Sequence, residues 1–378
     1  MQQYLYDIAL YQIEGIGAVL ARQLIAYCGS SEAALKMSAA SLQKIPQIGE
    51  VLAQKITSQS AALIKKAHKD LEAIAKNNIQ IVALHEENYP KRLREIHDAP
   101  LLLYYQGNTP LNAQRVIAIV GTRQASDYGK SITEQLVKDL KKYNPLIVSG
   151  LAYGIDIAAH RAALKYELPT LGVLANGLDQ IYPKDHLKTA QEMQQQGGLI
   201  TENALGIKAD ATRFPARNRI IAGLSDATIV VEAREKGGAL ITANLANEYD
   251  REVFAVPNDV NKINAVGCHH LIKTNKAHLL TEAEDIAYLL NWDNQQPNKS
   301  IHSPQLTLNL WQQLQENEQK IAQFIQKQKE AIASIDDLIA HLQLSASQVN
   351  VHLFNLEMQG IVRTLPGNKI QLLMQIKN

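Results

Sequence analysis

Short apolar runs alternate with amphipathic stretches between about residues 79 and 290. The runs are rich in Val, Ile and Leu and have the length of strands, whereas the stretches between them carry apolar residues at helical spacing. Strands that alternate with helices form a parallel sheet with helices on both faces, because each parallel connection must cross over the sheet. The predicted strands are Val116–Val120, Leu146–Val148, Thr170–Leu174, Leu199–Thr201, Thr228–Val231, Val253–Val256 and His278–Leu280.

A helical pattern fills residues 1–78 and contains a short internal repeat. Ile13–Gly17 leads into one amphipathic stretch, and Ile45–Gly49 leads into another. Both predict a tight turn followed by a helix, and together they resemble paired helix-hairpin-helix (SAM-like) units. In such units a glycine turn presents backbone amides to a DNA phosphate. The second turn lacks the first glycine of that motif, so glycines that merely cap helices in a small bundle stay an alternative.

The C-terminal part of the chain predicts a linker followed by a small domain. Residues 291–317 are rich in Asn, Gln, Pro and Ser, as is typical of a linker. Residues 318–378 then show three helical stretches and a hairpin, the order of a winged helix, and Ser345 should cap the third helix. That helix, Ser347–Gln359, contains no Lys or Arg. Because major-groove reading needs basic anchors, we favour a protein-contact or weak accessory role for this tail.

Composition excludes several classes of protein. The 378 residues are 46% hydrophobic and carry a formal net charge of only +1, so any nucleic-acid contact must use a concentrated basic patch. Cys28 and Cys268 are the only cysteines, which excludes a disulfide framework or a thiolate zinc site and fits a reducing cytosol. The start of the chain has no signal-peptide profile, and no apolar run approaches a membrane span. We therefore expect a cytoplasmic protein.

The basic patch that this balance requires is the run Arg213–Leu224. Pro215 favours a first helical turn, and the apolar residues that follow give the helix a buried side. Three arginines in this run add forked donors suited to phosphate, and the helix start adds backbone amides. The alternative interpretation is a solvated basic turn.

Four loops should meet at one rim of an extended Rossmann-like, doubly wound sheet, because ligands bind beyond the carboxyl ends of its strands. They are Gly121–Arg123, Ser149–Asp156, the arginine run and Glu232–Thr242. A dinucleotide site is not supported, since the first loop has a single glycine and no acidic residue ends the second strand. A phosphate-binding P-loop string is also missing from the sequence.

Candidate catalytic residues are few. Asp156 and His160 lie four residues apart on a predicted helix, and Glu248 and Glu252 share that spacing. A capping carboxylate and a buried imidazole account for the first pair, and no nucleophilic triad signature occurs. We therefore predict a site that holds an anion and does no catalysis, with no cofactor and no metal.

A series of motifs occurs in order between about Asn88 and Ile286. They are Gly121–Arg123, Ser149–Asp156, Ala159-His160, Gly177–Asp179, Tyr182-Pro183, Phe214–Leu224, Val230–Ala233, Gly238–Ala243, Arg251–Pro257, Gly267-Cys268 and Leu271-Ile272. Together these motifs resemble one family, DNA-processing protein A (the DprA/Smf family). The resemblance implies a bacterial cytoplasmic protein of natural transformation and recombination. Such a protein binds and protects incoming single-stranded DNA, loads the recombinase RecA onto it, and forms a homodimer through its Rossmann-like domain.

By position, the resemblance also implies the residues of the DNA site. Arg123 and Arg217 would pair with phosphates, and Phe214 would stack on a base. In the alternative interpretation, Asn218 and Arg219 hold loops together and Phe214 fills the core. The implied site comprises Gly121, Thr122, Arg123, Ser149, Gly150, Arg213, Phe214, Arg217, Asn218, Arg219, Gly237 and Gly238. Asn258 and Ala175-Asn176 depart from the family pattern and put only the shape of nearby loops in doubt. Val266–Thr274, with Leu271 and Ile272, is the candidate dimer contact.

Two other functions stay open. A nucleotide phosphoribohydrolase-type enzyme would grip one 5′-phosphate with the same loops and use Glu232 on the sugar, but only Gly237-Gly238 remains of its glycine-rich string. A regulator of double-stranded DNA would act through the C-terminal tail.

Overall fold

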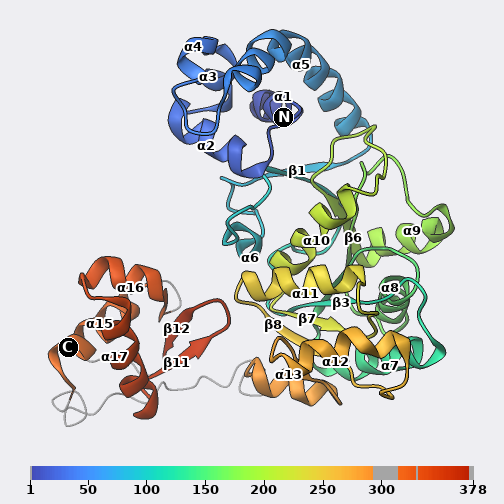
Figure 1. Ribbon diagram of the computed structural model, residues 1–378, viewed down its shortest axis with the longest axis vertical. Coiled ribbons are helices and arrows are strands. Elements are labelled where there is room, and N and C mark those ends of the chain that lie inside the picture. The colour runs from blue at the N-terminus through green and yellow to red at the C-terminus, as the bar shows by residue number, and fades with distance from the viewer. Residues whose placement is uncertain (1, 293–313, 329–330, 374–378) are drawn as a thin grey trace. The chain divides into compact units, whose positions relative to one another are not determined.

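The structure is a computed structural model that describes residues 2–292, 314–328 and 331–373 (Figure 1). The chain divides into two compact units between Ala283 and Glu284. The first unit contains the N-terminal helices and a large sheet, and the second contains the C-terminal helices and a small sheet. Most of the expected 291–317 linker lies outside the described residues. The domain boundaries expected from the sequence stay predictions.

The large sheet has nine strands in the order β1-β2-β6-β5-β4-β3-β7-β8-β9. The strands from β6 to β9 in this order pair in parallel, whereas β1 and β2 are antiparallel to each other and β2 is antiparallel to β6. Each of the seven predicted strands is confirmed, and β1 and β2 were missed. The strands are β1 (Gln80–Ala83), β2 (Leu102–Gly107), β3 (Val116–Val120), β4 (Leu146–Ser149), β5 (Thr170–Val173), β6 (Gly197–Thr201), β7 (Ala227–Val230), β8 (Glu252–Ala255) and β9 (His278–Leu279).

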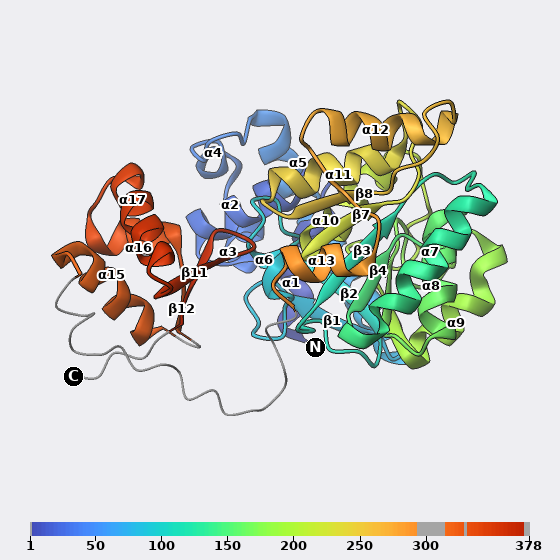
Figure 2. The same ribbon diagram turned by 90° about the horizontal axis from the view of Figure 1, so that it is seen from below.

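Helices cover both faces of this sheet, which confirms the doubly wound α/β fold (Figures 1 and 2). On one face α8 packs against α7 and α9, and on the other α10 packs against α11. Residues of β2 divide accordingly: Leu102 and Tyr104 join the core of the first face, and Leu103 and Tyr105 join the core of the second. The helices are α6 (Lys91–Arg94), α7 (Asp127–Leu140), α8 (Ile155–Lys165), α9 (Leu187–Gln196), α10 (Arg213–Leu224), α11 (Gly238–Glu248) and α12 (Val266–Lys273).

The direction of winding reverses at β3. The chain passes from β3 through β4 and β5 to β6, and then returns to β7, which pairs with the free side of β3. The carboxyl ends of β3 and β7 therefore diverge into loops that lead to opposite faces of the sheet. In open α/β sheets this reversal point is where ligands bind.

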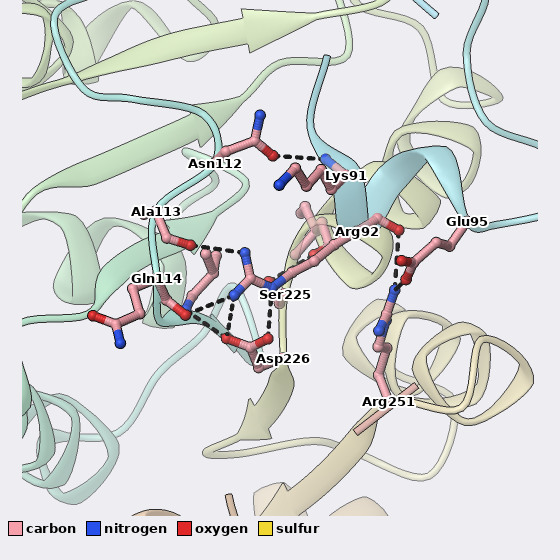
Figure 3. Close-up of polar contacts among 11 residues, drawn as sticks. Lys91, Arg92, Glu95, Asn112, Ala113, Gln114, Ser225, Asp226 and Arg251 are labelled. Atoms are coloured by element: carbon pink, nitrogen blue, oxygen red, sulfur yellow. Dashed lines mark hydrogen bonds and ion pairs between the residues drawn. The ribbon is translucent and has the colours of Figure 1, made fainter. Parts of the chain in front are cut away.

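A cluster of ion pairs holds α6 against the chain on both sides of the reversal (Figure 3). Arg92 pairs with Asp226, with 2.5 Å between Nε and Oδ1, and also donates to the carbonyl oxygens of Ala113 and Gln114 at 2.8 Å. Asp226 in turn accepts the amide of Val116 at 2.8 Å, which fixes the starts of β3 and β7 together. The cluster therefore anchors β3 and β7 at their amino ends, opposite the loops that form the candidate site.

The N-terminal helices confirm the repeat, and their turns have matching hydrogen bonds. The amide of Ile13 donates to Leu10, and 32 positions later the amide of Ile45 donates to Leu42. Gly15 has φ +98° in the first turn, and Gln47 reaches φ +65° at the matching place in the second. The second turn thus keeps the helix-hairpin-helix geometry without its glycine. The helices are α1 (Leu5–Tyr11), α2 (Ala18–Cys28), α3 (Ser31–Lys36), α4 (Ala39–Leu42) and α5 (Glu50–Lys76).

The second unit has a winged-helix arrangement around its own apolar core. Ser345 caps α17 as expected, because its side chain accepts the amide of Gln348. The hairpin is confirmed, and the strand β10 that completes its sheet in the order β10-β12-β11 was missed. The elements after α13 (Ala283–Leu289) are α15 (Glu316–Lys327), β10 (Ile332–Ser334), α16 (Ile335–Leu342), α17 (Ala346–Met358), β11 (Val362–Leu365) and β12 (Lys369–Leu372).

Candidate functional site

A cavity of about 290 Å³ opens at the reversal point of the sheet. Its walls come from the loops after β3, β4 and β7, from α10 and from the first turns of α8 and α11. It combines cationic side chains with small residues, as an anion site requires. The lining residues are Val120, Gly121, Thr122, Arg123, Ala152, Asp156, Phe214, Pro215, Arg217, Asn218, Ile221, Arg234, Lys236, Gly237, Gly238, Ala239, Ile241 and Thr242.

The structure brings together most of the expected site residues at this cavity. Eight of the twelve line it: Gly121, Thr122, Arg123, Phe214, Arg217, Asn218, Gly237 and Gly238. Ser149, Gly150, Arg213 and Arg219 are not among the lining residues. Two of these four, Ser149 and Gly150, lie directly behind the wall, where they contact Asp156 and Arg217.

Arg217 forms the floor of the cavity and is only 4% exposed. One terminal nitrogen donates to the carbonyl oxygens of Gly150 and Val173, at the ends of β4 and β5. Its Nε has no hydrogen-bond partner among the described residues. Burial lowers the pKa of Arg217 to about 10, so the guanidinium stays charged at neutral pH. A buried cation with an unused donor, at the wall of a cavity, can bind an anion strongly because water screens it little.

Gly150 has no side chain at the place where that guanidinium lies. A Cβ built on Gly150 would overlap both terminal nitrogens of Arg217. The glycine is therefore required for the position of the buried cation, although it contributes nothing to the cavity wall itself.

Asp156 lies beside Arg217 in the first turn of α8 and is 6% exposed. Its Oδ2 accepts the amide of Ala152 at 3.4 Å. Burial raises the pKa of Asp156, and the charge of Arg217 acts in the opposite direction. Both side chains line the cavity, and no ion pair joins them.

Phe214 lies at the mouth of the cavity between two guanidinium groups. The carbon Cζ of Arg123 is 4.9 Å from the ring centroid, and Cζ of Arg217 is 5.9 Å from it. The ring is half-buried and belongs to none of the described apolar cores. Arg123 is exposed, and no carboxylate among the described residues pairs with it. An aromatic face flanked by cations is an arrangement that can stack a base and hold its phosphate.

The arginine run does not point to one place. Arg219 is turned toward Glu202 and Asp98, with which it forms ion pairs, and Tyr11 of α1 donates to the same Glu202 at 3.0 Å. Arg213 donates to Asn203 at 3.0 Å. Contacts of this kind are what the alternative role of Arg219, in holding loops together, predicts.

The expected rim loop Glu232–Thr242 brings two further cations to the cavity, Arg234 and Lys236, which the implied list of site residues did not include. Both are exposed. Arg234 also donates to Gln124 at 2.7 Å and to Asn264 at 3.1 Å, which joins the two loops that flank the reversal point. Their place directly after a predicted strand, beside Gly237, was the signal that could have found them.

Comparison with known proteins decides the family. A model for DNA recombination-mediator protein A matches residues 80–291. The chain belongs to the DprA/Smf family. A DprA winged-helix model matches residues 311–368 of this DprA/Smf member, and a SAM-like helix-hairpin-helix model matches residues 7–62.

Relatives of this DprA/Smf chain cover most of its length. Protein Smf of Synechocystis is 32% identical over 97% of this chain and 98% of its own. DNA processing protein DprA of Bacillus subtilis is 35% identical over 72% of this chain and 91% of its own. The X-ray structure of DprA from Streptococcus pneumoniae aligns with TM-score 0.66 and 32% identity over 75% of this chain and 97% of its own.

A second solved structure bears on the site of this family. It is DNA processing protein A from Helicobacter pylori, described for its single-stranded DNA binding mode, with TM-score 0.52, 32% identity, and coverage of 57% of this chain and 96% of that one.

Two candidate catalytic residues of this DprA/Smf chain, Glu232 and His160, are held by contacts outside the cavity. Glu232 does not line the cavity, because its carboxylate accepts the amide and the hydroxyl of Ser126 at 2.9 and 2.5 Å at the start of α7. His160 is buried against Thr170, at 2.7 Å, and burial lowers its pKa to about 3. The described residues hold no group of three potential metal ligands, and none of their helices is long and apolar enough to cross a membrane.

Gly150→Ala should lower the melting temperature, because the new methyl group would displace the buried guanidinium of Arg217. Overpacking of this kind costs about 1–3 kcal/mol, and each kcal/mol corresponds to about 2–4 °C in a unit of this size. Thermal denaturation measures the effect. Gly238→Ala is the matched control, since nothing lies within 4 Å of its Cβ. Equal melting temperatures for the two variants would contradict the packing described here.

Proposed function

We propose that this chain binds single-stranded DNA at the reversal-point cavity, and that it does so as a binding protein without catalysis. The observation that carries the proposal is the buried Arg217, with its unused Nε, beside the exposed Arg123 and the ring of Phe214. A backbone phosphate would pair with the two guanidiniums, and a base would stack on the ring. Neither contact reads sequence, so the strand would be bound whatever its bases.

A second cavity supports a polymer as the ligand. It has a volume of about 610 Å³ and includes Tyr182, Lys184 and Lys208 in its wall. The ring of Tyr182 is 52% exposed, and its centroid is 6.1 Å from that of Phe214. We infer that the strand continues from Phe214 across Tyr182, where the two lysines would meet the next phosphates. A mononucleotide would leave this second site empty.

The role of the bound strand follows from the family. We propose that the protein acts in natural transformation and recombination in the cytoplasm, protects incoming single strands and loads the recombinase RecA onto them. Two comparisons support this role: relatives are named DNA processing proteins, and the Helicobacter pylori structure is described for its single-stranded DNA binding mode.

We further propose a homodimer through the edge of the large sheet. The short strand β9 ends the sheet, and a groove of about 570 Å³ beside it is lined by Val260, Ile272 and Leu279 among others. Val260 is 78% exposed and Leu279 is 50% exposed. Leu271, expected as a contact from the sequence, is only 2% exposed and packs into the core. Open sheet edges and apolar grooves are surfaces that a second copy can cover.

Substitution of both Arg123 and Arg217 by Ala should weaken binding to all single-stranded sequences alike. Each lost charged contact costs about 1.5–3 kcal/mol, and the slope of log affinity against log salt should flatten by about 0.7 per lost phosphate contact. Fluorescence anisotropy over a salt series measures both quantities. Lys165→Ala is the control, because this exposed residue is the last of α8, whose first turn lines the cavity. Unchanged affinity in the double variant would refute the site.

Val260→Asp should convert a dimer into a monomer, because it places a charge in the apolar groove. Sedimentation velocity or light scattering measures the mass. Val51→Asp is the control, since Val51 is also exposed, at 71%, but lies on α5. A monomeric unmodified chain, or a dimer that both variants keep, would exclude this interface.

RecA loading should appear as faster assembly of RecA filaments on a strand already covered by a single-strand-binding protein. The double variant of Arg123 and Arg217 should give no acceleration, because it cannot hold the strand. If the unmodified chain does not accelerate assembly while it binds the strand, the loading role is wrong and the binding role stands.

A further inference from the structure

One residue of the cavity is at odds with an anion site. Asp156 is the single carboxylate among the lining residues of this cavity, in the part of the chain that the structure describes. It is nearly fully buried, so water does little to weaken its field. A negative charge at this place opposes every phosphate that enters, and a helix cap does not by itself require it to face a cavity.

The charges around Asp156 come from three other elements. Arg217 of α10 and Arg123 of the loop after β3 face it with positive charge, and the amide of Ala152 in the loop after β4 donates to it. Arg217 and Asp156 are both buried but form no ion pair with each other, and the guanidinium donates instead to the carbonyl oxygens of Gly150 and Val173. The remaining cations, Arg123, Arg234 and Lys236, are exposed and therefore screened by solvent.

We propose that Asp156 sets the charge that this cavity accepts, so that a singly charged phosphodiester is favoured over a doubly charged terminal phosphate. A backbone phosphodiester carries one negative charge, whereas a terminal phosphate carries about −1.5 to −2 near pH 7, with a second pKa of about 6. The added charge meets the buried carboxylate at low dielectric but gains little from the screened cations. Asp156 is thus a specificity-determining residue that selects the interior of a strand over its ends and over free nucleotides. The proposal rests on the proposed DNA-binding function.

A matched pair of competitors isolates this single charge. Thymidine 5′-monophosphate and its monomethyl phosphate ester share base and sugar and differ by one ionisation. Each competitor is titrated against a complex of the full chain with a labelled oligothymidylate at pH 7.5. Fluorescence anisotropy measures the displacement and gives the affinity of each competitor. The unmodified chain should bind the ester more tightly. Asp156→Asn, which keeps the shape and loses the charge, should shift the ratio of the two affinities toward the monophosphate by about tenfold.

Asp127→Asn is the control, because Asp127 begins α7 and its side chain is fully exposed. This variant should keep the ratio of the unmodified chain. A purely structural role for Asp156 would change both affinities together and leave their ratio unchanged, which would overturn the proposal.

A second measurement needs no variant and protects the test against misfolding of Asp156→Asn. For the unmodified chain, the preference for the ester should shrink between pH 7.5 and pH 5.5, because the monophosphate loses its second charge in that range. Tighter binding of the monophosphate at pH 7.5, or a ratio that does not change with pH, would overturn the proposal. Failure of the unmodified chain to bind the oligothymidylate at all would instead overturn the proposed function.

Discussion

The buried guanidinium of Arg217 is the constraint on which the site depends. A charge with 4% exposure needs compensation from groups fixed in place, and here the carbonyl oxygens of Gly150 and Val173 and the carboxylate of Asp156 supply it. These groups come from the ends of β4 and β5 and the start of α8, while the cation comes from α10 on the opposite face. The floor of the cavity therefore combines groups from both faces of the sheet, at the carboxyl ends of its strands. Gly150 leaves room for the guanidinium, and α10, which begins at Arg213, carries both Phe214 and Arg217 to the cavity.

The sequence revealed the architecture because the parallel strands have a simple signal. A strand buried on both faces reads as a continuous apolar run, and β3 to β7 are buried along their whole length. The two antiparallel strands, β1 and β2, were missed because they lie in a region where turns and a short helix break the pattern. The short β10 was missed because it consists of only Ile332–Ser334. It is recognisable as a strand only by its pairing with β12, which is distant in the chain.

The site was predictable in its location and less so in its members. Strand ends and the reversal point placed the loops at one rim, and the resemblance carried the residue names. The resemblance singled out Arg217 for phosphate and left Arg219 open between a DNA contact and a role in holding loops together. Arg217 and Arg219 are two positions apart on one helix, so they must point in nearly opposite directions. Which of the two meets the cavity depends on Glu202 and Asp98, brought close only by the fold.

The N-terminal helices and the sheet share one apolar core, although separate family models describe them. Leu10 and Leu71 of these helices belong to the same cluster as Met193 of α9 and Leu199 of β6. Tyr11 and Arg219 meet at Glu202 on the boundary between the two regions. The helical hairpins thus complete the apolar core on one face of the sheet and do not form an independent domain. Evolutionary loss of the hairpins from this chain would have to be accompanied by polar replacements across the newly wetted face.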